Sequence, residues 1–224
     1  MSNERLIAAL ADELSPVRRA PAPGHLTMSW LAVTVPILAL VTLMMGPRPA
    51  LLSLLLRPGF ALDEALALLT AIAAAYAAFC AGRPDQPGWK LLLPVGAMAL
   101  WLGVLGRQCL LLSVSTQGGA LRLHVDAMCV PAIAVAGIAP AVAMVWLLRR
   151  SPMFRTAHAC LCGALAAAAL AECTLRLFHG SDSFLTLLVW QMGSVVLFTL
   201  AVGAVGRAAL GRARSGRTVS YAGS

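Results

Sequence analysis

The residues best suited to chemistry are a thiol, two imidazoles and two carboxylates in two short stretches of the chain. His124, Asp126 and Cys129 lie close together in the sequence, and His179 and Asp182 share a later segment. Cysteine, imidazole and carboxylate groups together suit a soft or borderline metal ion. The sequence leaves two interpretations open: a metal site built from Cys129, His124, Asp126 and His179, or two ordinary polar loops.

Cys129 is the cysteine best placed for a redox or metal role. It lies at the predicted outer end of a membrane span. In a bacterium the compartment on that side is oxidising, and a thiol there is therefore a candidate for redox chemistry or metal binding. Free cysteine is otherwise a small buried apolar residue. We expect the remaining cysteines to be buried apolar residues of this kind; they are Cys80, Cys109, Cys160, Cys162 and Cys173.

Glu172 is the only acidic residue that falls well inside a predicted span. A carboxylate within a membrane is a candidate for function. Arg176 follows four residues later, however, and Glu before Arg at this spacing is a favourable helical pair. We therefore expect a structural ion pair between Glu172 and Arg176. A proton or ion pathway would need polar partners on other helices at the same depth, and the sequence indicates none.

Composition places the chain in a membrane. Of its 224 residues, 60% are hydrophobic and 12% are charged, whereas a soluble domain is about half apolar and a quarter charged. The formal charge of +8 does not indicate nucleic-acid binding, because the basic residues lie between apolar runs rather than on one polar face. The chain has no nucleophile elbow, glycine-rich phosphate loop, CxxC or HExxH motif. We predict that it is not an enzyme and uses no cofactor.

The apolar runs predict an all-α polytopic protein with six transmembrane helices of about 20 residues each. They lie near residues 27–46, 65–82, 91–112, 127–148, 157–178 and 184–205. The fifth is almost all alanine over residues 163–171, and small residues allow close helix packing in lipid, so we place it centrally. Prolines bracket the apolar stretch 50–56, which we interpret as a short interfacial helix.

Six spans place both chain ends on one side of the membrane. Most of the 17 basic residues then fall on the side of the termini, and the positive-inside rule makes that side the cytoplasm. We predict a multi-pass membrane protein with three parts. Residues 1–25 form a cytoplasmic helix and linker, residues 26–206 form the transmembrane domain, and the basic residues 207–224 form a disordered cytoplasmic tail.

The N-terminal segment predicts a short amphipathic helix that Ser15-Pro16 ends, because a residue before proline is driven out of the α region. Apolar residues recur on one helical stripe. A helix this short is marginal in water unless that stripe docks on lipid, on the membrane domain or on a soluble partner. The partner-binding candidates are the stripe and the basic linker, namely Leu6, Ile7, Leu10, Leu14, Arg18 and Arg19.

Several short motifs, in this order, match a known family. They are Leu6-Ile7, Leu10-Ala11-Asp12, Pro16-Val17-Arg18-Arg19, Gly46-Pro47-Arg48-Pro49, Arg57-Pro58-Gly59-Phe60, Cys129, and His179 with Asp182-Ser183 ahead of Trp190. The sequence resembles the NrsF family of six-span anti-sigma factors, the negative regulators of sigma-F-type extracytoplasmic-function sigma factors. The likeness covers nearly the whole chain.

The resemblance implies that the N-terminal segment holds an extracytoplasmic-function sigma factor at the inner membrane. It also implies that two outer cysteines sense heavy-metal or oxidative stress and release that sigma factor. Cys129 matches the first position, whereas Gly180 stands where the second cysteine is usual. Either Cys173 or Cys109 takes its place, or the protein senses something else.

The sensor candidates are Cys129, Cys109, Cys173, His179 and Asp182. The implied partners are the sigma factor, the lipid bilayer and a heavy-metal ion, with no direct contact to nucleic acid.

Two other functions remain open. A small six-span transporter or channel would need a polar lining, and beyond Glu172 the spans offer little except Thr70, Gln191 and a few serines. A helix that only lies on lipid is disfavoured by the acidic residues that flank its stripe, because they would repel an anionic leaflet.

Overall fold

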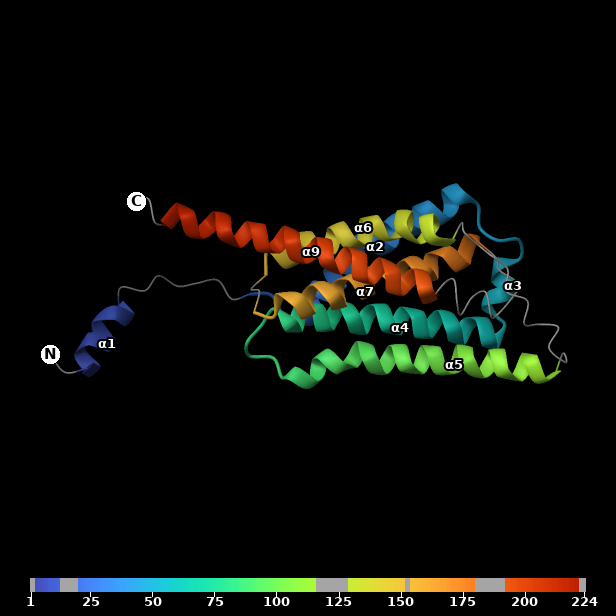
Figure 1. Ribbon diagram of the computed structural model, residues 1–224, viewed down its shortest axis with the longest axis horizontal. Helices are drawn as coiled ribbons and strands as arrows, with labels where there is room; N and C mark the ends of the chain where they lie inside the picture. Colours follow the sequence, from blue (N-terminus) through green and yellow to red (C-terminus); the bar gives the residue numbers. More distant parts are fainter. Residues whose placement is uncertain (1–2, 13–19, 116–128, 152–153, 180–191, 222–224) are drawn as a thin grey trace.

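The computed structural model describes residues 3–12, 20–115, 129–151, 154–179 and 192–221. Within these ranges the regular elements are helices (Figure 1). In chain order they are α1 (Asn3–Asp12), α2 (Pro23–Met45), α3 (Leu51–Leu55), α4 (Pro58–Ala81), the 3-10 helix η1 (Gly88–Leu92), α5 (Leu93–Ser115), α6 (Cys129–Arg149), α7 (Thr156–Phe178) and α9 (Met192–Tyr221).

Five segments of the described chain are long and apolar enough to cross a membrane: α2, α4, α6, α7 and the continuous segment of η1 and α5 from Gly88 to Leu111. They confirm the first five predicted spans. The sixth is confirmed in part, because α9 carries a shorter apolar stretch, Met192–Ala208, and the start of that predicted span lies outside the described residues. The prediction of an all-helical membrane protein is therefore supported.

Helix α4 begins earlier than the sequence predicts. Pro58 stands at the start of the helix, where its missing N–H costs nothing and its fixed φ suits the first turn. The predicted span began at residue 65, which left Asp63 and Glu64 in a loop. The structure places both acidic residues inside the helix, and Asp63 is buried.

Helix α7 forms the centre of the bundle, as its alanine content predicts. It packs against α2, α4, α6 and α9, and the side chains of Ala166, Ala167, Ala168 and Ala169 are fully buried. A Cβ atom at Gly163 would lie 2.8 Å from the Cγ atom of Met144 on α6. Small residues therefore allow α7 to approach its neighbours closely.

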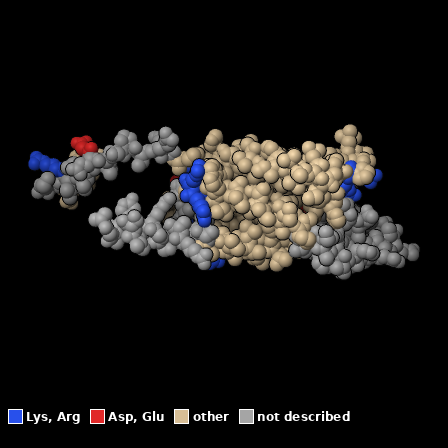
Figure 2. Space-filling model, turned by 90° about the horizontal axis from the view of Figure 1, so that it is seen from above, with Lys and Arg blue, Asp and Glu red and all other residues tan. Residues whose placement is uncertain are grey.

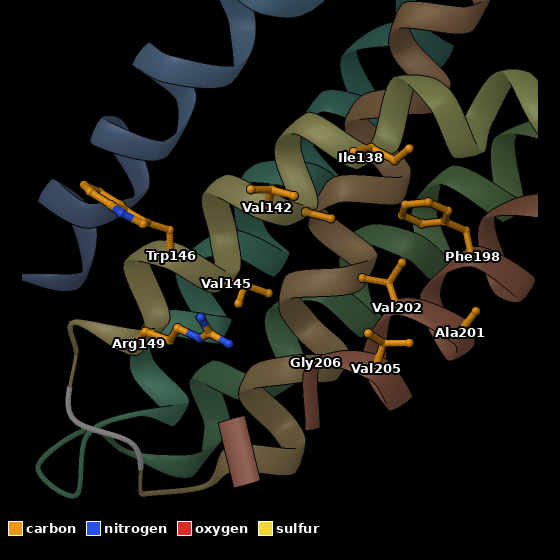
Figure 3. A pocket seen from close by; sticks show the side chains of 11 residues that line it. Ile138, Val142, Val145, Trp146, Arg149, Phe198, Ala201, Val202, Val205 and Gly206 are labelled. Atoms are coloured by element: carbon orange, nitrogen blue, oxygen red, sulfur yellow. The ribbon is translucent and has the colours of Figure 1, made fainter. Parts of the chain in front are cut away.

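Four of the other long helices cover α7, and α5 lies outside α4. Helix α4 supplies a second set of buried alanines, and α5 packs on its outer side. The indole of Trp30 on α2 donates a hydrogen bond of 3.0 Å to the carbonyl of Pro140 on α6. Helices α6 and α9 lie side by side with an apolar groove between them (Figure 3).

The two ends of the bundle carry different segments. Figure 1 shows α1 and the C-terminal part of α9 at the same end as the α4–α5 and α6–α7 connections, with α3 at the opposite end. The two connections are joined, because the backbone N–H of Arg155 donates to the carbonyl of Ala81 at 2.9 Å. On the face drawn in Figure 2, Lys and Arg lie at the ends and other residues cover the middle. This distribution suits a protein that crosses a bilayer.

The C-terminal segment differs from the prediction of a disordered tail. Helix α9 continues to Tyr221, through most of the basic segment that begins at Arg207. Alanine, leucine and arginine are strong helix formers, and extending an existing helix avoids the cost of nucleation. The short helix predicted within residues 50–56 is confirmed as α3.

Candidate functional site

The N-terminal helix α1 carries the first part of the predicted docking stripe. Leu6, Ile7 and Leu10 lie on it at helical spacing, and the Ile7 side chain is 65% exposed. Helix α1 does not pack against the long helices (Figure 1). The remaining candidates, Leu14, Arg18 and Arg19, lie outside the described residues. The side chain of Ile7, the stripe residue whose exposure the structure describes, is therefore open to a partner.

The described residues just before α2 lie at the end of the bundle where the α4–α5 connection is found. Arg83 in that connection donates a hydrogen bond to the carbonyl of Pro21. Helix α2 then begins at Pro23. This contact ties the residues before α2 to the α4–α5 connection.

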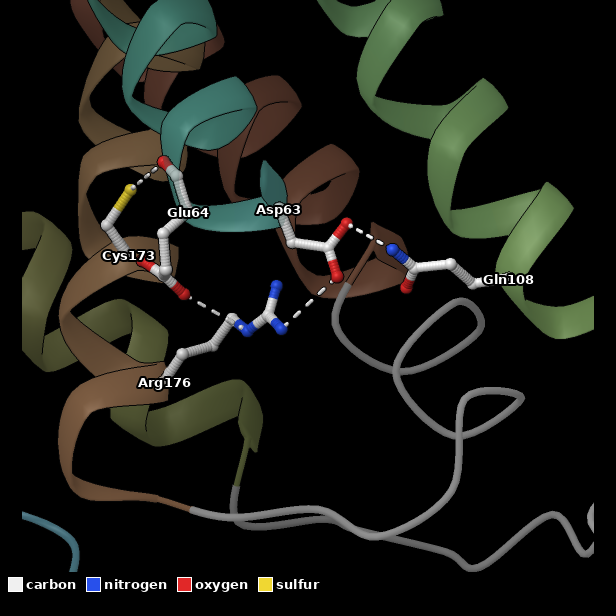
Figure 4. A network of polar contacts seen from close by, with 5 residues as sticks. All are labelled: Asp63, Glu64, Gln108, Cys173 and Arg176. Atoms are coloured by element: carbon white, nitrogen blue, oxygen red, sulfur yellow. Dashed lines mark hydrogen bonds and ion pairs between the residues drawn. The ribbon is translucent and has the colours of Figure 1, made fainter. Parts of the chain in front are cut away.

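A buried charge cluster lies near the opposite end of the bundle, between α4, α5 and α7 (Figure 4). The guanidinium of Arg176 on α7 lies between the two neighbouring acidic residues of α4. Its Nη2 atom is 3.5 Å from Oδ2 of Asp63, and its Nε atom is 3.2 Å from Oε1 of Glu64. The side chains of Arg176 and Asp63 are 8% and 1% exposed, so this ion pair is almost fully withdrawn from solvent.

Two further contacts extend the charge cluster. Nε2 of Gln108 on α5 donates to Oδ1 of Asp63 at 3.4 Å. The thiol of Cys173 lies 4.0 Å from the backbone carbonyl of Glu64, as a weak hydrogen bond. Figure 4 shows that these side chains come from three helices and point toward one another. The cluster therefore joins α4, α5 and α7.

The predicted pair between Glu172 and Arg176 is corrected by the structure. Arg176 pairs with Asp63 and Glu64 across the interface, whereas Glu172 is fully buried and neither of its carboxylate oxygens has a hydrogen-bond partner among the described residues. The reason is the early start of α4, which brings two carboxylates opposite the guanidinium. Pro58 was the signal that could have placed them inside the helix.

The charge cluster also corrects the expectation that no polar partners lie at the depth of Glu172. One guanidinium lies between the carboxylates of Asp63 and Glu64, and burying charge in excess of its partners is costly in a membrane. The arrangement can hold helices in register and can accept a proton. Among the described residues, no group of three or more His, Cys, Asp or Glu side chains is arranged to bind a metal ion.

The predicted sensor residues fall in different places. Cys173 belongs to the charge cluster, and Cys109 follows Gln108 on α5; both are free thiols. His179 caps the end of α7, where its backbone N–H donates to the carbonyl of Leu175 at 2.7 Å. Cys129 opens α6. Its side chain, together with His124, Asp126 and Asp182, lies outside the described residues, so the metal site and the sensor stay predictions.

Comparison with known proteins gives one match. The model of the NrsF family, described as negative regulator of sigma F, matches residues 10–211. The matched region runs from within α1 to the C-terminal part of α9 and so includes the five long apolar segments of the described chain. No curated protein and no solved structure is similar enough to the chain to count as a match. Because the family model covers most of its length, the chain belongs to the NrsF family of negative regulators of sigma F.

Proposed function

We propose that the protein is an anti-sigma factor of the inner membrane that binds an extracytoplasmic-function sigma factor through α1. The observation that carries this proposal is the family match over residues 10–211, combined with an exposed α1 that stands apart from the bundle. A membrane-bound regulator of this kind acts by sequestration. It needs a binding surface and a membrane anchor, and no catalytic group.

The binding surface is the apolar stripe of α1. Amphipathic helices commonly lay such a stripe into a groove of a helical partner, with anchors three and four residues apart. Leu6, Ile7, Leu10 and Leu14 have this spacing, and Arg18 and Arg19 follow them. A helix of this length gains most of its stability by docking. We therefore expect α1 to be ordered chiefly in the complex.

The proposed orientation places both termini in the cytoplasm, where a sigma factor is found. It is supported by the excess of Lys and Arg in the segments on the side of the termini. It is also supported by the common position of α1 and the C-terminal part of α9 at one end of the bundle (Figure 1).

The proposed signal acts from the opposite side of the membrane. Cys129 at the start of α6 is the candidate sensor of heavy-metal or oxidative stress, with His124, Asp126, His179 and Asp182 as further ligands on that side. Cys173 or Cys109 supplies a second thiol. Cys173 is of interest because it contacts the charge cluster that joins three membrane helices, and a change at its thiol would reach that junction.

A charge placed on the stripe tests the binding surface. We expect Leu10→Asp to reduce co-purification of a co-expressed sigma factor roughly tenfold or more, since a lost leucine anchor costs about 2 kcal/mol. The matched control is Ala8→Asp, which puts the same charge on the opposite face of α1 and should bind normally. Equal amounts of both variants in the membrane fraction exclude an effect on insertion. Undiminished binding by Leu10→Asp would refute the proposed surface.

A further inference from the structure

The groove between α6 and α9 is lined almost wholly by apolar side chains (Figure 3). Its volume is about 450 Å³, within the range of sites that hold small organic ligands. Val142, Val145 and Val202 form much of its wall. At one end the ring of Phe198 closes it: a Cβ atom on Gly137 would collide with that ring, so Phe198 lies directly against α6.

The other end of the groove is basic. Arg149, the last residue of α6, lines it, and Figure 3 shows this side chain at the end that Gly206 of α9 also borders. Arg150 stacks over the ring of Trp146, 3.6 Å from its centroid, and Arg207 follows Gly206 in the sequence. These three arginines are exposed. Among the described residues that line the groove, none is acidic.

An apolar slot that ends in arginine and tryptophan fits a lipid. Tryptophan is enriched at the membrane–water interface, so Trp146 sets the level of the headgroups. Basic sites between membrane helices bind anionic headgroups. Acyl chains are as apolar as leucine, so filling the slot gives little selectivity. Selectivity must come from the phosphate, because arginine pairs with it through charge-assisted hydrogen bonds.

We propose that the groove binds an anionic phospholipid, with an acyl chain between α6 and α9 and the phosphate on Arg149. A zwitterionic lipid binds less well, because its own ammonium group competes for the phosphate. An apolar helix of a second copy would leave Arg149 without a counter-charge at the mouth of the groove. The site is independent of sigma-factor binding, and either proposal can fail without the other.

Native mass spectrometry of the full-length protein tests the site. The protein is released from nanodiscs that contain equal amounts of phosphatidylglycerol and phosphatidylethanolamine, and the lipids that stay bound are counted. We expect phosphatidylglycerol to be retained preferentially. Arg149→Gln should reduce this preference roughly fivefold, the factor for one arginine near an anionic surface.

A matched pair of variants tests the slot itself. Ala201 lines the groove, whereas its neighbour Leu200 does not line it and is 58% exposed. Ala201→Trp fills the slot and should remove the bound phosphatidylglycerol, and Leu200→Trp should retain it. Both positions are exposed on the surface of the bundle, so both variants should fold.

Three results would overturn the proposal. The first is equal retention of the two lipids by the unaltered protein. The second is phosphatidylglycerol binding that survives both Arg149→Gln and Ala201→Trp. The third is a dimer that Ala201→Trp alone dissociates, which would assign the groove to a second copy.

Discussion

At the scale of single residues, Arg176 has the clearest structural role. Among the described residues it is the one cation in an ion pair with Asp63 and Glu64, and its guanidinium also lies 5.0 Å from the centroid of the Phe60 ring. Removing one partner of a buried ion pair leaves an uncompensated buried charge. The resulting loss of stability is far larger than the net stabilisation that the pair provides. The charge cluster thus depends on this side chain.

We expect Arg176→Met to destabilise the protein by about 3–5 kcal/mol. Glu172→Gln should be neutral or stabilising, because it removes a buried carboxylate that has no hydrogen-bond partner among the described residues. The midpoint of detergent-induced unfolding measures both effects. If Glu172→Gln were as damaging as Arg176→Met, the arginine would be paired with Glu172, as the sequence alone suggests.

Cys129 is the residue on which the proposed sensor depends. We expect Cys129→Ser to blunt the induction of a sigma-dependent reporter by a thiol-reactive metal, because serine does not replace the thiolate as a soft ligand. Cys80→Ser is the control, since Cys80 lies near the other end of the bundle at the end of α4. Unchanged induction in the Cys129 variant would end the proposal for this cysteine.

At the scale of elements, the close approach of α6 and α7 depends on Gly163. We expect Gly163→Leu to cost about 1–3 kcal/mol, since the added atoms must displace Met144 in a filled interface. Gly96→Leu on α5 is the matched control, because a Cβ atom there meets nothing within 4 Å. Thermal unfolding in detergent compares the two. Equal midpoints would show that α6 and α7 do not need the glycine.

Much of the helical architecture follows from local sequence. A span must be long and apolar, and α7 must be central because its alanines leave little side chain to separate it from its neighbours. The apolar spacing of α1 is likewise local. The end of α2 can also be predicted from the sequence, because glycine is common just after a helix. In the structure Gly46 follows α2 and takes a φ of +86°, a conformation that favours glycine.

The charge cluster could not be predicted in the same way. The partner of Arg176 depends on which helices touch and on where α4 begins, and a shift of one or two turns decides whether Asp63 and Glu64 lie in a loop or in the interior. A prediction from hydropathy alone excludes charged residues from a span. It therefore placed Asp63 and Glu64 in a loop rather than in α4. The length of α9 was missed for a related reason, since a basic composition suggested disorder although its residues favour helix.

At the scale of the whole molecule, the proposed function assigns anchoring to the bundle and partner binding to the short helix α1. The charge cluster supplies the polar partners that a transport pathway would require, but its groups are paired across α4, α5 and α7, which suits a structural junction. The family match and the isolated position of α1 favour a regulator. The central claim is that α1 meets a sigma factor in the cytoplasm.

Photocrosslinking from Ile7 in intact cells tests this claim most directly. A photoreactive residue replaces Ile7, whose side chain is 65% exposed, or Ala8 on the opposite face of α1 as a control. We predict a covalent product between the Ile7 variant and an extracytoplasmic-function sigma factor, with far less product from Ala8. Crosslinks from the Ile7 variant only to lipid or to periplasmic proteins would contradict the proposed contact.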